Sequence, residues 1–157
     1  GHLVFSTLHT NDAPSAVTRL VDMGVQDYLL ASSLIGILAQ RLVRVNCKSC
    51  KRPEKVPASM LKQAGFDMIG SGDVVEIQKG QGCPECDHTG YTSRIGIFEL
   101  LDIDDEMRHL VVTTADSTVL KAQAVRSGMR TLKEDGWNKV LAGTTTPDEI
   151  LRVTQEV

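Results

Sequence analysis

Four cysteines are the residues of this chain whose type and spacing most clearly predict chemistry. They form two C-x-x-C pairs, Cys47 with Cys50 and Cys83 with Cys86. Two thiolates at this spacing can face one ion from a tight turn, and two such pairs complete a tetrahedron that leaves no open position. The pattern predicts one structural Zn²⁺, and it uses all 4 cysteines of the 157-residue chain.

Other interpretations of the cysteines stay open on the sequence alone, namely two disulfides, a redox-active pair, or iron in place of zinc. Disulfides need an oxidising compartment, and no secretory signal is visible. A redox role needs only one pair. The gap between Cys50 and Cys83 is longer than the roughly 15–20 residues common in zinc ribbons, which predicts a folded insert between the pairs. His88 is a rival fourth ligand that two complete pairs make unnecessary.

The bulk composition limits the classes of function. Hydrophobic residues make up 41% and charged residues 24%, as in ordinary soluble domains. No apolar run reaches the roughly 18 residues of a membrane span. The alternative function is a stand-alone zinc ribbon that binds protein or nucleic acid. A net charge of −3 and an aromatic content of 4% do not supply the basic, aromatic face that nucleic acid requires.

The elements that must position the cysteines begin with a block of residues 1–46. The apolar run at 3–8 predicts a buried strand, and since a lone strand needs partners for its backbone, we expect the chain to begin inside a larger domain. The other predicted elements of this block are a helix capped by Asp12 and ended by Gly24, a second helix from Asp27 through Leu38, and a strand at 41–45.

Two further blocks complete the chain. Residues 47–90 hold every cysteine and three of the 5 prolines, with a short helix at 58–64 and a short strand at 74–77. A block this small needs a metal to stabilise it. Residues 91–157 predict a strand at 95–101 and then a small bundle of helices near 105–113, 117–127, 132–142 and 147–156. Thr131 and Thr146 begin capping-box patterns, and Gly128 and Gly143 stand where helices end.

Four stretches of the sequence resemble, in the same order, the secretion ATPases that drive type II secretion and type IV pilus assembly. Residues 6–13, Ser-Thr-Leu-His-Thr-Asn-Asp-Ala, are similar to the family's His box. The other three stretches are 39–50, 82–101 and 128–146. Pilus-retraction relatives lack the four-cysteine insert, so the chain is similar to the assembly and export branch.

The resemblance implies an α/β fold with three parts. Residues 1–46 would be the C-terminal part of a RecA-like P-loop ATPase core, residues 47–90 an inserted tetracysteine zinc subdomain, and residues 91–157 a strand and a helical C-terminal subdomain. It also implies a hexameric cytoplasmic motor, peripheral at the inner membrane, that hydrolyses ATP with Mg²⁺. The motor would push pilin or pseudopilin subunits through an inner-membrane platform protein and bind no nucleic acid.

The sequence departs from the family in one respect. The phosphate loop G-x-x-x-x-G-K-[ST] does not occur in the 157 residues. That loop supplies the amides and the lysine that hold the β- and γ-phosphates. We therefore expect a C-terminal fragment of the motor that does not hydrolyse ATP by itself.

The resemblance also implies nucleotide contacts for single residues. His9 matches the catalytic histidine that faces the γ-phosphate, and an imidazole can donate to a phosphate oxygen. Thr7 could orient water or phosphate through its hydroxyl. From the residues alone, His9 could equally bond backbone groups of a turn, and Thr7 could form a cross-strand hydrogen bond.

Three further residues have open nucleotide roles. The resemblance places Arg94 near the base or ribose, where a flat guanidinium can stack. The alternative is a surface arginine paired with Glu99 or Asp102. Gln40 and Arg41 could lie at a subunit boundary or on a solvated strand face.

Overall fold

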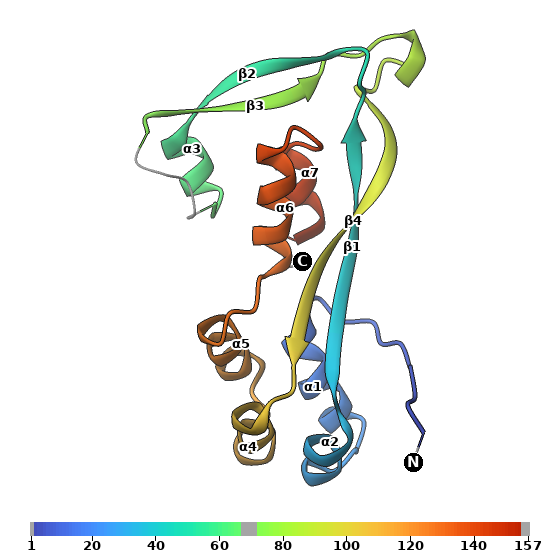
Figure 1. The fold of residues 1–157 in the computed structure, drawn as a ribbon, viewed down its shortest axis with the longest axis vertical. Coiled ribbons are helices and arrows are strands. Elements are labelled where there is room, and N and C mark those ends of the chain that lie inside the picture. The colour runs from blue at the N-terminus through green and yellow to red at the C-terminus, as the bar shows by residue number, and fades with distance from the viewer. Residues whose placement is uncertain (1, 67–71, 155–157) are drawn as a thin grey trace. The chain divides into compact units, whose positions relative to one another are not determined.

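The computed structural model describes residues 2–66 and 72–154 (Figure 1). Two sheets of two strands each, β1 with β4 and β2 with β3, occur with helices, so the predicted mixed α/β class is confirmed. The elements in chain order are α1 (Ala13–Asp22), α2 (Asp27–Ser33), β1 (Gly36–Asn46), β2 (Lys51–Pro57), α3 (Ala58–Gln63), β3 (Val74–Gly80), the 3₁₀ turn η1 (Pro84–Cys86), β4 (Tyr91–Asp102), α4 (Asp105–Thr113), α5 (Ser117–Arg126), α6 (Leu132–Leu141) and α7 (Pro147–Thr154).

The chain divides into two compact units and passes between them at three places. The first unit consists of residues 1–39 and 99–130, and the second of residues 40–98 and 131–157. Helices α4 and α5 therefore belong to the first unit, whereas α6 and α7 belong to the second. The helices that we expected to form a single bundle are thus divided between the two units.

The first unit is built on two helix pairs, α1 against α5 and α2 against α4. Asp12 caps α1 as predicted, since its carboxylate accepts from the Ser15 amide at 3.0 Å. Val17, Val111 and Leu120 are fully buried in this unit. Gly24, at φ +90°, follows the end of α1 and confirms the predicted helix terminus.

The predicted strand at 3–8 is wrong. Residues 2–10 form neither helix nor strand, and the side chains of Leu3, Val4 and Phe5 are 67%, 78% and 89% exposed. An extended segment becomes a strand only when a neighbour accepts and donates its backbone hydrogen bonds. In the part of the chain that the structure describes, neither sheet includes this segment.

The second predicted helix begins at Asp27 but ends earlier than expected. The hydroxyls of Ser32 and Ser33 donate to the carbonyl of Leu29, at 3.0 and 2.6 Å, and so satisfy a carbonyl of the last turn. Leu34 is already extended, with φ −69° and ψ 135°. Leu38 consequently lies in β1, which starts five residues before the predicted strand at 41–45.

The second unit contains a strand that the sequence did not predict. β2 pairs antiparallel with β3, from Lys51 opposite Gly80 to Pro57 opposite Val74. β2 contains Pro53 and Pro57, and among the described residues it pairs with β3 alone, an edge position at which proline is tolerated. In the same unit, the rings of Phe66 and Trp137 pack with their centroids 4.9 Å apart.

The predicted helix starts of the second unit, at residues 58, 132 and 147, are confirmed. Thr131 and Glu134 form the capping box that starts α6. α6 and α7 pack against each other. Residues 155–157, which include the predicted end of the last helix, lie outside the described residues.

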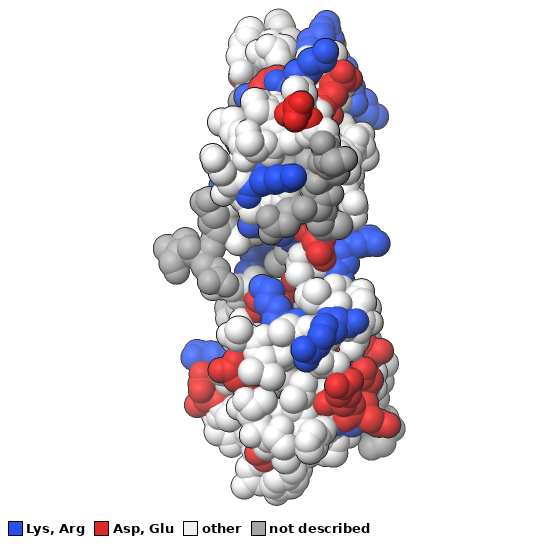
Figure 2. Space-filling model, turned by 90° about the vertical axis from the view of Figure 1, so that its left-hand side faces the viewer, with Lys and Arg blue, Asp and Glu red and all other residues white. Residues whose placement is uncertain are grey.

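The surface and the helix lengths add two observations. Basic and acidic side chains are intermixed on the face that Figure 2 presents, in keeping with 17 Lys and Arg against 20 Asp and Glu in the sequence.

Among residues 2–66 and 72–154, no helix has both the length and the apolarity needed to cross a membrane.

Candidate metal centre

The four predicted cysteines come together in the second unit. Their sulfur atoms all lie within 4.8 Å of one another. The Sγ–Sγ distances are 3.8 Å for Cys47 and Cys83, 3.8 Å for Cys50 and Cys86, and 3.7 Å for Cys83 and Cys86. All four are free thiols, so the alternative of two disulfides does not describe this structure.

The spacing of the sulfurs fits a tetrahedral ion. Four sulfurs placed about 2.3 Å from a central Zn²⁺ form a tetrahedron with edges of about 3.8 Å. These three separations match this edge length within 0.1 Å. The donor set is therefore suited to a metal with four thiolate ligands and no coordinated water.

Short turns between strands position the ligands. Cys47 directly follows β1, and Cys50 directly precedes β2, so one turn presents both sulfurs. Cys83 precedes η1, and Cys86 ends it. The Cys47 amide donates to the carbonyl of Gly90 at 2.8 Å, which joins the first turn to the segment after the second.

On either side of Cys83 and Cys86 in the sequence, Gly80 and Gly90 bring two backbone segments unusually close together. A Cβ atom added at Gly80 would lie 2.0 Å from the Gly90 carbonyl oxygen, closer than any side chain allows. Only glycine permits this approach of β3 to the start of β4. The glycines around the cysteines thus bring the two turns together.

Backbone amides also aim at one of the sulfurs. The amides of Cys83 and Gly90 donate to the Cys86 sulfur at 3.2 and 3.3 Å. Burial raises the pKa of Cys86, but these two hydrogen bonds, together with contacts to the Cys83 and Cys50 side chains, outweigh burial and lower the pKa to about 7. Burial and the hydrogen bond with Cys86 raise the pKa of Cys83 to about 12. Cys86 is therefore better prepared than Cys83 to be a thiolate.

Polar contacts tie the strands behind the cysteines to the C-terminal helices. Asn46 is 2% exposed, and its side-chain amide donates to the carbonyls of Gln78 at 2.8 Å, Thr145 at 3.2 Å and Gly143 at 3.3 Å. Its backbone amide donates to the carbonyl of Thr144 at 2.8 Å. Asn46 is thus held by both β3 and the loop between α6 and α7.

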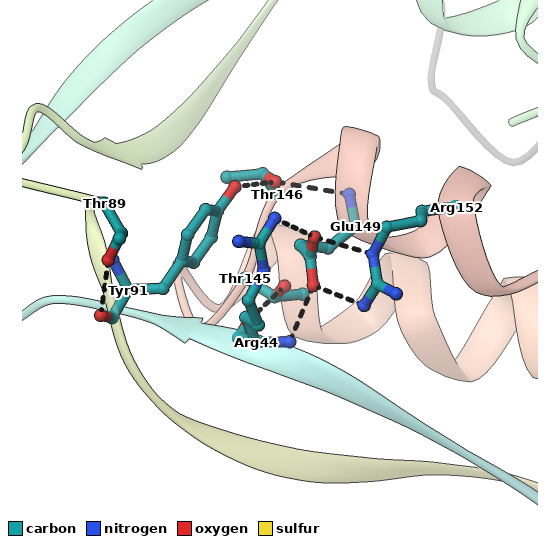
Figure 3. A network of polar contacts seen from close by, with 7 residues as sticks. All are labelled: Arg44, Thr89, Tyr91, Thr145, Thr146, Glu149 and Arg152. Carbon is teal, nitrogen blue, oxygen red and sulfur yellow. Dashed lines mark hydrogen bonds and ion pairs between the residues drawn. The ribbon is translucent and has the colours of Figure 1, made fainter.

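A second network surrounds the buried carboxylate of Glu149 (Figure 3). It accepts from the guanidinium and the amide of Arg44, at 2.7 and 2.9 Å, and from Arg152 at 2.9 and 3.0 Å. The Arg44 guanidinium also lies 4.3 Å from the centre of the Tyr91 ring, and the Tyr91 hydroxyl lies 2.8 Å from that of Thr146. Glu149 of α7 is therefore bound to β1, and Thr146, just before α7, is bound to β4.

Comparison with known proteins decides the family. The family described as type II/IV secretion system protein matches residues 1–152. The chain belongs to this family. The resemblance of the four sequence stretches is thereby confirmed.

Three relatives in the secretion family illustrate the match. The chain is 47% identical over 156 residues to a type II secretion system protein E of Pectobacterium carotovorum, covering 99% of the chain and 30% of the relative. It is 48% identical over 156 residues to the type II secretion system protein HxcR of Pseudomonas aeruginosa, covering 99% and 29%. It is 46% identical over 158 residues to the type IV pilus assembly ATPase PilB of Thermus thermophilus, covering 99% and 17%. The chain thus spans less than a third of each.

The residues predicted to contact nucleotide in this secretion family protein lie in both units. Thr7 and His9 are exposed in the segment 2–10 of the first unit. Arg94 is exposed on β4, in the second unit. Their contacts with nucleotide stay predictions.

Other residues weighed for the nucleotide site have defined places. Gln40 is exposed and Arg41 half-buried, both on β1. Glu99, considered as a surface partner of Arg94, is instead 2% exposed, and its carboxylate accepts from the Ala13 amide at 2.8 Å. This carboxylate therefore supports the start of α1.

The sequence did not predict the shell of residues around the cysteines. Asn46 adjoins Cys47, which was its only available signal. Glu149 was predicted as the reciprocal half of a capping box with Thr146. The Glu149 amide does approach the Thr146 hydroxyl, at 3.4 Å, but the carboxylate accepts from Arg44 and Arg152.

Proposed function

We propose that this chain is the C-terminal part of a hexameric ATPase that powers type II protein secretion or type IV pilus assembly. The observation that carries the proposal is the family match over residues 1–152, together with 46–48% identity to proteins named for these two processes. In the proposal, residues 1–46 belong to a RecA-like core, residues 47–90 form the zinc subdomain, and residues 91–157 supply a strand and the C-terminal helices.

The proposed metal is Zn²⁺ held by Cys47, Cys50, Cys83 and Cys86. The tetrahedral spacing of the sulfurs supports this assignment. When bound, the ion supplies folding free energy and not catalysis, because four thiolates leave no position for a reactive water. The zinc subdomain would then act as a rigid docking surface.

The proposed nucleotide contacts follow the family. His9 would donate from its imidazole to the γ-phosphate of ATP, and Thr7 would orient water or phosphate through its hydroxyl. Arg94 would contact the base or ribose. The phosphate loop and the acidic groups for Mg²⁺ would come from a different part of the motor, since the present 157 residues contain no such loop.

The proposed setting is the cytoplasmic face of the inner membrane. There the hexamer would act on pilin or pseudopilin subunits through a platform protein, without nucleic acid. The names of the relatives support both secretion and pilus assembly, so the proposal covers the two processes together.

The role of His9 provides the test. In an ATPase-competent protein that contains this sequence, we expect His9→Ala to lower kcat for ATP about 100-fold or more, the usual effect of losing one donor to transition-state charge. His2→Ala is the matched control, because His2 is exposed in the same segment. A kcat of His9→Ala equal to that of the control would contradict the proposal. The isolated 157-residue chain should show no turnover that follows it through a sizing column.

A further inference from the structure

The loop between α6 and α7 contacts the strand that carries the first cysteine. Gly143, Thr144 and Thr145 all offer backbone carbonyls to Asn46, the residue immediately before Cys47. In return, the Thr145 hydroxyl donates to the carbonyl of Arg44 at 2.7 Å. Nearly 100 residues of sequence separate the two sides of this contact.

The surroundings of Asn46 require a hydrogen-bond donor. Its side-chain nitrogen faces three carbonyl oxygens, those of Gln78, Gly143 and Thr145. Its side-chain oxygen is buried and has no partner among the described residues. An aspartate would have the same shape but would place a negative oxygen against carbonyl oxygens, which is strongly unfavourable in a buried site.

Hydrogen bonds and one peptide link connect this loop to the sulfurs. Asn46 is covalently joined to Cys47, whose amide donates to the Gly90 carbonyl. The Gly90 amide donates in turn to the Cys86 sulfur. The 143–145 loop therefore contacts the residue next to Cys47. It fixes the end of β1 that is followed by this ligand.

The Glu149 carboxylate provides a second, independent anchor for the same strand. It binds both the amide and the guanidinium of Arg44, two residues before Asn46. Glu149 is 1% exposed, so the contact is enclosed by protein. The end of β1 is consequently held from one side by residues that follow α6.

We propose that the 143–149 segment is the outer shell of the metal centre, with Asn46 and Glu149 as positioning residues for Cys47. Metal binding and docking of the C-terminal helices are then coupled, and the coupling acts equally in both directions. This inference rests on the proposed zinc site but not on the ATPase activity. Outer-shell residues of this kind change metal affinity by about 10–100-fold when replaced.

The test measures zinc affinity of the 157-residue protein by competition with a chromogenic chelator. Wild type should bind one Zn²⁺ per chain, and Asn46→Asp should bind it at least tenfold more weakly. Asn138→Asp, the same chemical change at an exposed position of α6, should stay within about threefold of wild type, because its side chain is solvated. If Asn46→Asp does not fold, Thr145→Val removes only the hydroxyl bond to Arg44 and should still weaken binding.

Hydrogen exchange tests the reverse direction of the coupling. On removal of zinc from wild type, amides at 143–150 should exchange at least tenfold faster. Folded variants that keep wild-type zinc affinity, or unchanged exchange at 143–150, would overturn the inference while leaving the zinc site intact. Absence of zinc from wild type would overturn both the site and the inference, and neither result bears on the role of His9.

Discussion

A single carboxylate, that of Glu149, shows how the charge of one residue depends on its setting. Burial raises its pKa, but hydrogen bonds from Arg152 and Arg44 outweigh burial and lower the pKa from 4.5 to about 2. The folded state therefore binds this proton less tightly than the unfolded state. The resulting stability is fully present above pH 4.5 and is lost as the pH falls toward 2.

Replacement of Glu149 by glutamine should remove this pH dependence. At pH 7 we expect Glu149→Gln to lower the free energy of unfolding by about 2 kcal/mol, a value reduced because both guanidinium groups are partly exposed. The difference from wild type should shrink between pH 4.5 and 2, where wild type also becomes neutral. Urea unfolding at pH 7, 4 and 3 measures this difference. A gap that does not change with pH would show that the charge of Glu149 contributes nothing.

Backbone conformation after the last cysteine offers another single-residue test. Asp87 follows Cys86 with φ 49°, a left-handed conformation that only glycine adopts without cost. Asp87→Gly should therefore be about 1 kcal/mol more stable than Asp87→Ala in urea unfolding at saturating zinc. Both variants lose the carboxylate, so the alanine variant is the control for charge. Equal stabilities would mean that the turn carries no strain.

At the residue scale, the sequence predicted the ligands but not what holds them. C-x-x-C spacing is a local signal, and all four cysteines were identified from it. Asn46 gives no such signal, because its three carbonyl partners come from β3 and from residues nearly 100 positions away. The partners of Glu149 were also missed, since the nearby capping-box pattern offered a local explanation for it.

Among the elements, predictions succeeded where the physical cause is local. α1 and α6 begin at the predicted caps Asp12 and Thr131, each of which bonds an amide of its own helix. Strands depend on a partner elsewhere in the chain. The segment 3–8 has a strand-like composition but no described partner, whereas β2 contains prolines yet pairs with β3.

The packing of α6 on α7 depends on a glycine inside a helix. A Cβ atom at Gly136 would lie 2.7 Å from the Cδ1 atom of Ile150, a fully buried side chain. Alanine improves helix propensity by about 1 kcal/mol, but overpacking costs about 1–3 kcal/mol. We expect Gly136→Ala to lower the free energy of unfolding by about 1 kcal/mol on balance.

A double-mutant cycle separates these two effects. Ile150→Val removes the atom nearest the new methyl group and should cost about 1 kcal/mol in wild type. In the Gly136→Ala background the same change should cost less, because it removes the Ile150 atom closest to the new methyl group. Additive effects in denaturant unfolding would exclude a clash at this contact.

For the whole molecule, the division into two units predicts an uneven response to metal loss. All four cysteines belong to the unit of residues 40–98 and 131–157. Chelation should speed amide exchange in β2, β3 and α6 by tenfold or more, while α1 and α5 of the other unit change little. Hydrogen exchange followed by mass spectrometry, with and without chelator, reads both units in one sample. Equal acceleration in both units would show that they unfold together.

The contact between Asn46 and the 143–145 loop also sets an order of events during protein synthesis. Gly143 follows Cys86 by 57 positions. At about 5–20 residues per second, the ribosome needs roughly 3 to 11 s to make this stretch. For that interval the nascent chain contains all four cysteines but lacks the 143–145 loop that binds Asn46. Oxidants and competing metals in the cell would have their easiest access to the cysteines in these seconds, before the 143–149 segment emerges.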